Sequence, residues 1–210
     1  VLDLNYTSFV GLHSIRTRHA KTIGELAEQF KAECFNKCEL YVMHMDGYKK
    51  EMWFDQTGLP WILPSPNMPT LDTAIVYPGM CLFEATNVSE GRGTTRPFEI
   101  FGAPFIDAVK LCKYMNGLKL PGVYFRENYF QPTFHKGAGQ ICGGAQIHVL
   151  DRDKFRSFEM AVKILQYLFH EYPKDFAWKE PPYEYEFHKL PIDILLGNGS
   201  FRKEFIERGL

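Results

Sequence analysis

The spacing of apolar residues in the first half of the chain predicts helices that alternate with buried strands. TIGELAEQFKAE (22–33) repeats its apolar residues at helical spacing, and Thr22 stands three residues before Glu25, as in a capping box. CELYVMHMDG (38–47) and MCLFEATN (80–87) place apolar groups on both faces, which is typical of buried strands. This alternation indicates an open, largely parallel α/β sheet.

A proline-rich stretch separates the two expected strands. FDQTGLPWILPSPNMPT (54–70) contains four prolines, so we expect no regular structure there, while its aromatic content argues against disorder. TLDTAIVYPG (70–79) then predicts a short helix with Thr70 as its N-cap.

Beyond Pro97 the pattern changes to helices that flank extended segments. The expected elements are a helix over 103–117, antiparallel extended segments over 123–134 and 142–151 joined by the glycine-rich HKGAGQ (135–140), and a helix over 155–173. We therefore predict an α/β region at residues 1–97 and an α+β domain at residues 98–210, with a boundary near Pro97.

Composition excludes several classes of protein. The chain has 210 residues, of which 45% are hydrophobic and 23% are charged, as in a globular protein with a core. Its net charge of −1 provides no field to recruit nucleic acid or an anionic membrane surface. No apolar run approaches the roughly 18 residues of a membrane span. The opening VLDLNYTSFVGLHSIRTRHA lacks the basic start and apolar core of a signal peptide.

Neither a metal nor a cofactor is expected. The five cysteines show no disulfide framework, and Cys34 and Cys38 would need His44 or Cys81 to complete a metal site. No CxxC or HxxxH pattern supports that site, so we favour buried thiols. The phosphate-binding patterns GxGxxG and P-loop are also absent from the sequence.

SEGRGTTRPFE (89–99) concentrates charges and hydroxyls in a short segment. Gly91, Gly93 and Pro97 disfavour a long helix, so the segment is predicted to be a loop. Its glycines would let the backbone closely approach another group, such as a ligand. It follows the expected strand at 80–87, and ligands collect at the carboxyl ends of strands in open α/β sheets.

Several motifs, in their order along the chain, resemble the NamZ-type exo-β-N-acetylmuramidases, a bacterial family formerly described as a domain of unknown function. The motifs are RHAKTIGEL (18–26), MWFDQTGLPW (52–61), SPNMPT (65–70), SEGRGTTRPFE (89–99) and CGGAQIHV (142–149). The resemblance implies a Rossmann-like N-terminal domain, an α+β C-terminal domain and an active site in the cleft between them. It implies the release of N-acetylmuramic acid from the non-reducing ends of peptidoglycan fragments, in the periplasm or outside the cell.

The resemblance also implies that this chain is part of a longer enzyme. Full-length relatives carry a large part of the Rossmann-like domain before the position that matches Val1. Residues 1–97 would then be the C-terminal part of that domain, with the missing N-terminal part as a partner. We expect the isolated chain to be weakly active or inactive. The alternative is a non-catalytic peptidoglycan-binding module or an inactive fragment.

Glycoside hydrolysis normally requires two carboxyl groups, and Glu90 is the leading candidate for one of them. It is expected to end a buried strand and to begin the glycine-rich loop. The alternative is a carboxylate paired with Arg92 or Arg96 to hold that loop. Glu84 is a second candidate, whereas Glu99 is interpreted as structural.

The arginines of the loop have a natural target on the implied sugar. N-acetylmuramic acid carries a lactyl carboxylate, which a guanidinium matches through two parallel hydrogen bonds. An internal Arg–Glu clamp is the alternative. The hydroxyls of the loop could bind the sugar or satisfy the turn, Asn67 could bind the acetamido group, and His19 could assist proton transfer or bond locally. The predicted substrate-binding residues are Arg92, Thr94, Thr95, Arg96, Asn67, Arg18 and His19.

Overall fold

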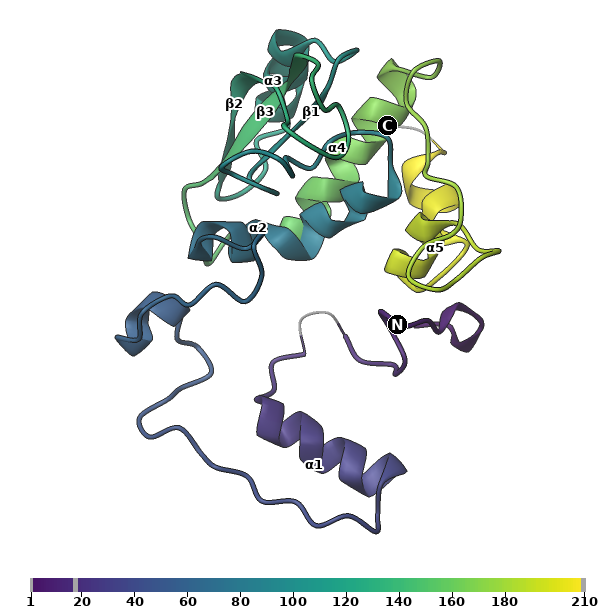
Figure 1. The fold of residues 1–210 in the computed structure, drawn as a ribbon. Coiled ribbons are helices and arrows are strands. Elements are labelled where there is room, and N and C mark those ends of the chain that lie inside the picture. The colour runs from purple at the N-terminus through teal and green to yellow at the C-terminus, as the bar shows by residue number, and fades with distance from the viewer. Residues whose placement is uncertain (1, 17–18, 209–210) are drawn as a thin grey trace. The chain divides into compact units, whose positions relative to one another are not determined.

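The computed structural model describes residues 2–16 and 19–208, which fall into two compact units. Unit 1 comprises Val1–Ser14 and Leu63–Leu210, and unit 2 comprises Ile15–Ile62 (Figure 1). Arg18, one of the predicted substrate-binding residues, lies outside the described residues.

Unit 1 is built on a three-stranded antiparallel sheet. Its strands are β1 (Ile100–Ala103), β2 (Val123–Phe130) and β3 (Cys142–Val149), in the order β1-β3-β2. The antiparallel pairing of β2 with β3 confirms the prediction for the two extended segments. Strand β1 was not predicted, because four residues are too short for a periodic pattern to identify a strand.

Helices complete unit 1, and most of them were predicted. Helix α3 (Ala108–Gly117) contacts β2 and β3, and α4 (Ser157–Glu171) packs against α2 (Leu71–Met80), as Figure 1 shows. A Cβ added to Gly79 in α2 would lie 2.0 Å from the Ser157 carbonyl oxygen, so only glycine permits this close approach. Two short elements, α5 (Pro191–Leu196) and the π-helical η4 (Arg202–Ile206), follow.

The core of unit 1 lies between the sheet and these helices. Apolar side chains from the α2 region, the loop over 89–99, the sheet, α3 and α4 are fully buried there, and the largest are Phe83, Phe98, Phe101, Phe125, Met80, Leu82, Leu111, Met115, Met160, Ile164, Leu165 and Leu168. Burial of this apolar surface is the main contribution to the stability of the unit.

The predicted strand over 80–87 is wrong. The segment is the end of α2 and a 3₁₀ helix, η3 (Cys81–Ala85). Its burial was predicted correctly, since Leu82 and Phe83 are inaccessible to solvent. A short apolar run looks the same in a buried strand and in a buried helix, so the pattern alone could not separate them.

The predicted strand over 38–47 is also absent from the structure. These residues form no ladder with any other described segment, and Tyr41 and Met43 are 84% and 94% exposed. A strand requires a hydrogen-bonding partner, which alternation alone does not supply. Among the described residues the only sheet follows Pro97, so the fold is mixed α/β with a small sheet. The domain boundary near Pro97 stays a prediction.

Unit 2 contains α1 (Ile23–Cys34) and the 3₁₀ helix η2 (Phe54–Thr57). The predicted capping box is confirmed: the Glu25 backbone N–H donates to Thr22 Oγ1 at 3.1 Å, and the Thr22 N–H donates to Glu25 Oε2 at 2.9 Å. Cys34 and Cys38 are free and exposed, which corrects the expectation that they are buried.

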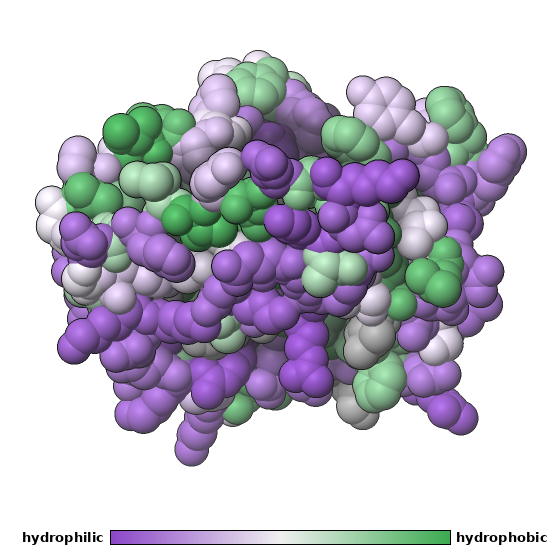
Figure 2. All heavy atoms as spheres, turned by 90° about the horizontal axis from the view of Figure 1, so that it is seen from below, coloured by the Kyte–Doolittle hydropathy of each residue, from purple (hydrophilic) through white to green (hydrophobic). Residues whose placement is uncertain are grey.

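One face of the molecule is predominantly polar. The face in Figure 2 is mostly hydrophilic, with apolar side chains in several separate groups. Within the described ranges, every helix is too short or too polar to cross a bilayer.

Candidate functional site

The loop over 89–99 is held in place by its own backbone. Ser89 and Gly102 exchange two backbone hydrogen bonds, at 2.9 and 3.0 Å, which fix the loop to β1. Gly91 has φ +80°, and a Cβ there would lie 2.6 Å from the Ile100 carbonyl oxygen. The predicted close approach of the loop backbone is therefore present, and its partner is the protein itself.

Glu90 is completely buried at the centre of this loop. Its side chain is 0% exposed, and Oε1 accepts a hydrogen bond from Arg92 Nε at 3.0 Å. Its second oxygen, Oε2, accepts a hydrogen bond from Lys136 Nζ at 2.8 Å. His135 Nδ1 lies 3.6 Å from Oε1. The carboxyl group therefore faces a guanidinium, an ammonium group and an imidazole.

Arg92 connects Glu90 to a second carboxyl group. Arg92 Nη2 donates to Glu84 Oε1 at 2.7 Å, and the Tyr183 hydroxyl donates to Glu84 Oε2 at 3.0 Å. Burial alone would lower the pKa of Arg92, but the hydrogen bond and charge of Glu84, followed by those of Glu90, raise its pKa overall. The guanidinium remains charged and holds the two glutamates in one network.

Lys136 fastens the turn over 135–140 to the loop. Besides Glu90, Lys136 Nζ contacts the carbonyl oxygens of Phe83 at 2.7 Å and Val88 at 3.3 Å. Burial lowers the pKa of Lys136, and the charge of Glu90 opposes this shift. Three acceptors converge on the ammonium group, which satisfies its three donors.

A hollow of about 330 Å³ opens beside this network, entirely within unit 1. The polar residues that line it are Glu84, Glu90, Arg92, His135, Lys179, Tyr183 and Glu184. Lys179 is exposed at the hollow, and its Nζ lies 5.3 Å from the centre of the Tyr183 ring. The ring face attracts the ammonium group.

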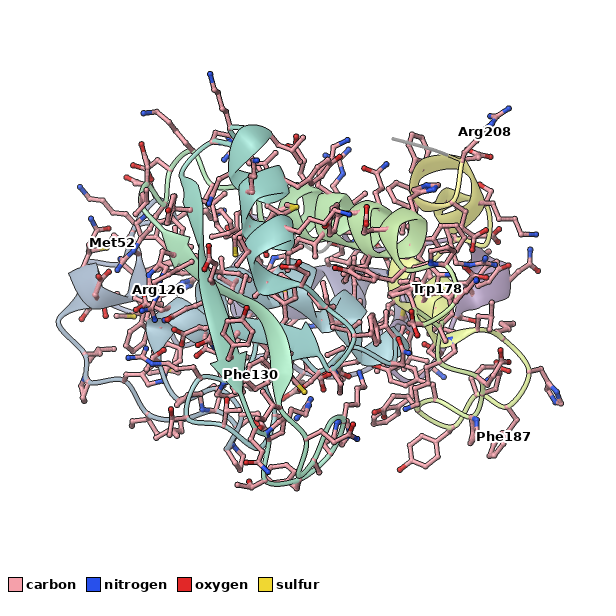
Figure 3. All side chains as sticks on the ribbon, turned by 90° about the horizontal axis from the view of Figure 1, so that it is seen from above. Met52, Arg126, Phe130, Trp178, Phe187 and Arg208 are labelled. Carbon is pink, nitrogen blue, oxygen red and sulfur yellow. The ribbon has the colours of Figure 1, made fainter. Side chains whose placement is uncertain are left out.

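The segment that carries Lys179 is paired with the chain just before the loop. Lys179 N–H donates to the Ala85 carbonyl at 2.8 Å, and Asn87 N–H donates to the Ala177 carbonyl at 3.0 Å. Trp178 lies between these contacts, near the end of α4 in Figure 3, and Phe187 marks the outer part of the loop that follows. The backbone of Lys179 is therefore fixed relative to Glu84 and Glu90.

Arg96 is also engaged with a glutamate, but in a different hollow. Arg96 Nη1 donates to Glu99 Oε2 at 3.1 Å. Glu99 Oε1 accepts from the hydroxyls of Thr70 at 3.0 Å and Thr73 at 2.7 Å. Arg96 and Glu99 both line a hollow of about 300 Å³ that borders β3. Internal Arg–Glu pairing, the alternative to ligand binding in the sequence analysis, is thus present at Arg92 and at Arg96.

The other predicted site residues lie outside the lining of the first hollow. The Thr94 hydroxyl donates to the Gly91 carbonyl at 2.6 Å and so satisfies the turn, and Thr95 is exposed. The Asn67 N–H donates to Ser65 Oγ at 3.4 Å. His19 belongs to unit 2, where its Nδ1 accepts from the Lys21 N–H at 3.1 Å. Roles for these residues in substrate binding stay predictions.

Sequence reasoning missed His135, Lys136, Lys179 and Tyr183. His135 and Lys136 belong to HKGAGQ, which looked like a simple connection between two strands. Tyr183 stands 99 positions from its partner Glu84, and such a contact leaves no local signal. The unusual backbone of His135, with φ +68°, is visible only in the structure.

The network can support proton transfer and the binding of anions. It combines three carboxyl groups, a guanidinium, an imidazole, a phenol and an exposed ammonium group around one hollow. Among the described residues, no cluster of three or more His, Cys, Asp or Glu side chains could hold a metal ion. All five cysteines are free.

The chain matches two family models. Residues 1–72 match the model described as exo-β-N-acetylmuramidase NamZ, N-terminal, and residues 75–209 match its C-terminal counterpart. The peptidoglycan β-N-acetylmuramidase NamZ of Bacillus subtilis (strain 168) is 45% identical over 209 residues, which cover 100% of this chain and 48% of that protein. The chain thus spans about half the length of the curated relative.

Two solved structures of DUF1343 family proteins from Bacteroides fragilis NCTC 9343 are similar to this one. The first is 32% identical with a TM-score of 0.86, covering 99% of this chain and 54% of that one. The second is 24% identical with a TM-score of 0.67, covering 100% of this chain and 54% of that one, and supports the fold alone.

Proposed function

The chain belongs to the NamZ family of exo-β-N-acetylmuramidases, and on that basis we propose that the protein containing it releases N-acetylmuramic acid from the non-reducing ends of peptidoglycan fragments. The relatives are about twice as long, so the proposal concerns a protein of their length. The Rossmann-like assignment of residues 1–97 and a location in the periplasm or outside the cell are parts of the same proposal.

The observation that carries the proposal is the Glu84–Arg92–Glu90 network beside the hollow. Glycosidases place a pair of carboxyl groups at the scissile bond. Arg92 contacts both glutamates, at 2.7 and 3.0 Å, and so keeps them in one place. Glu84 is the more accessible of the two, with 17% of its side chain exposed against 0% for Glu90. We propose that the reaction depends on both, with Glu84 reaching the hollow and Glu90 acting from its buried position through the groups around it.

Recognition of the muramic acid would depend on positive charge at the hollow. Arg92 uses Nε and one Nη2 hydrogen on the two glutamates, which leaves donors for a ligand. Within the described part of the chain, the Lys179 ammonium makes no hydrogen bond or ion pair and lies over the Tyr183 ring. We propose that Lys179 is the principal partner of the lactyl carboxylate and that Arg92 chiefly holds the two glutamates.

The proposal is tested with a protein of the relatives' length and a disaccharide that ends in N-acetylmuramic acid. Released sugar is measured for wild type, Glu90→Gln and Glu84→Gln, with the exposed Glu159→Gln on α4 as control. Glu90→Gln should reduce turnover by about 10²–10⁴-fold, while Glu159→Gln stays at the wild-type rate.

Two outcomes would overturn these assignments. Undiminished turnover by Glu90→Gln would remove Glu90 from the reaction. Binding of the disaccharide by the folded wild type without any hydrolysis would support the peptidoglycan-binding module instead. The isolated 210-residue chain, assayed in parallel, should be weakly active or inactive.

A further inference from the structure

Complete burial prevents Glu90 from touching a sugar by itself. Its side chain is 0% exposed, and both oxygens already contact Arg92 or Lys136. A catalytic group must come within hydrogen-bonding distance of the proton that it transfers. If Glu90 serves the reaction, it does so through a neighbour that reaches the hollow.

His135 is the neighbour that lies close to Glu90 and also reaches the hollow. Its Nδ1 lies 3.6 Å from Glu90 Oε1, and 47% of its side chain is exposed. His135 also lines the hollow. The two imidazole nitrogens diverge, so when Nδ1 faces the carboxylate, Nε2 is available on the other side of the ring. At 3.6 Å this contact is electrostatic, and the negative charge of Glu90 favours a ring orientation in which an Nδ1–H faces the carboxylate.

The backbone of His135 is strained, and neighbouring contacts maintain that strain. Its φ of +68° lies in the left-handed region, which residues other than glycine rarely adopt. Lys136, the next residue, is fastened to three acceptors, and Thr133 N–H donates to the Gly93 carbonyl at 2.9 Å. Strained residues of this kind cluster at functional sites, because surrounding structure must hold them in place.

We propose that His135 is the proton-transfer residue of the glycosidase reaction and that Glu90 is its positioning residue; this inference rests on the proposed function. His135 Nε2–H gives its proton to the glycosidic oxygen as the bond between that oxygen and C1 breaks. Water adds to C1 and gives up a proton, and the imidazole regains one. The sum is one glycosidic bond and one water converted into two hydroxyl groups.

Charged groups of both signs surround the imidazole. Glu90 lies 3.6 Å from its Nδ1, and Lys136 pairs with the other oxygen of Glu90. Arg92 is shared between Glu84 and Glu90, and Glu184 and Tyr183 complete the groups around the hollow. The ring therefore lies in a site with charges of both signs.

The test compares two substrates with leaving groups of different quality, in a protein of the relatives' length. A disaccharide with N-acetylmuramic acid at its non-reducing end needs protonation of a poor leaving group, whereas a nitrophenyl muramide needs little. His135→Asn keeps a residue that tolerates the left-handed backbone but cannot transfer the proton. It should lose about 10²–10⁴-fold in kcat/KM on the disaccharide and less than about tenfold on the nitrophenyl muramide.

Two further variants separate the roles. Glu90→Gln should show the same preference for the good leaving group, because it acts through His135. His135→Gly should regain disaccharide turnover when imidazole is added, which a purely structural histidine would not allow. The exposed His170→Ala on α4 serves as the matched control and should behave as wild type.

The outcomes distinguish the two proposals. If wild type hydrolyses neither substrate, the proposed function fails. If wild type hydrolyses both substrates, the assignment of His135 is overturned by either of two results for His135→Asn. One is an equal fall in kcat/KM on the two substrates, and the other is no fall in kcat/KM. Circular dichroism of each variant confirms that its fold is retained before rates are compared.

Discussion

Lys136 and Glu90 form a buried ion pair that joins two segments 46 positions apart. Lys136 Nζ lies 2.8 Å from Glu90 Oε2, with 16% of the lysine side chain and 0% of the glutamate side chain exposed. The turn between β2 and β3 is thereby fastened to the loop over 89–99. This pairing places His135 beside the carboxyl group, so the geometry of the hollow depends on it.

Removing Lys136 should destabilise unit 1. In Lys136→Met the Glu90 carboxylate loses one of its two cationic partners while remaining fully buried. Breaking a buried pair on one side costs about 3–5 kcal/mol, and we expect the lower end because Arg92 remains. Urea unfolding followed by circular dichroism measures the change. The exposed Lys113→Met on α3 is the control. A loss no greater than that of Lys113→Met would show that the pair adds little.

Arg92→Ala and Lys179→Met should affect substrate selection differently. Loss of Arg92 leaves Glu84 and Glu90 without their shared cation, so kcat/KM should fall alike for muramic and glucosamine glycosides. Lys179→Met keeps the length of the side chain and removes only its charge. It should reduce kcat/KM roughly tenfold for the muramic glycoside alone, since a charge-assisted hydrogen bond is lost.

The control for this pair is the exposed Lys174→Met, which lies outside the lining of the hollow. An equal fall for both sugars in Lys179→Met would remove Lys179 from carboxylate recognition. If kcat/KM of Arg92→Ala fell for the muramic glycoside alone, the Arg92 guanidinium would be the principal group that binds the lactyl carboxylate.

Arg202 should be required for the packing of the last two helical elements. Its Nε and Nη2 donate to both oxygens of Asp193 at 2.9 and 3.2 Å, and it also pairs with Glu207. Arg202→Leu leaves Asp193 buried without its cation, so we expect a loss of about 3–5 kcal/mol in the free energy of unfolding.

The double variant Arg202→Leu with Asp193→Leu should be less destabilised than Arg202→Leu alone, because no unpaired charge remains buried. Chemical denaturation of the single and double variants measures this, with Lys203→Leu, the exposed neighbour, as reference. A double variant as unstable as the sum of the two single ones would contradict the argument.

Tyr77 should make the protein sensitive to alkaline pH. Burial, followed by the charge of Glu84, raises the pKa of Tyr77 from 10.0 to about 12. Between these values the unfolded chain releases the phenolic proton and the folded protein retains it. The contribution of Tyr77 to stability is therefore complete below pH 10 and is lost as the pH rises to about 12.

Unfolding of wild type and Tyr77→Phe between pH 8 and pH 12 measures this contribution. The stability difference between them should move in favour of Tyr77→Phe above about pH 10. Tyr124→Phe, at an exposed position on β2, is the matched control. A constant difference between wild type and Tyr77→Phe over this range would contradict the assignment.

The sequence by itself determined the elements with long periodic patterns or explicit caps. The capping box of Thr22 and Glu25, the N-cap at Thr70 and the amphipathic α4 were all predicted and are present. It also identified the family, because its motifs follow one another in order over nearly the whole chain. These features depend on residues that are close together in the sequence, so they can be recognised without the structure.

The tertiary structure alone decided the type of the buried apolar run over 80–87 and the partners of Glu90. Burial of Leu82 and Phe83 follows from their apolar side chains, but helix or strand depends on which backbone groups find partners in space. In the same way, Lys136 meets Glu90 only because β2 and β3 bring the turn between them back to the loop. Contacts between distant segments arise from the fold as a whole, and no local pattern of residues encodes them.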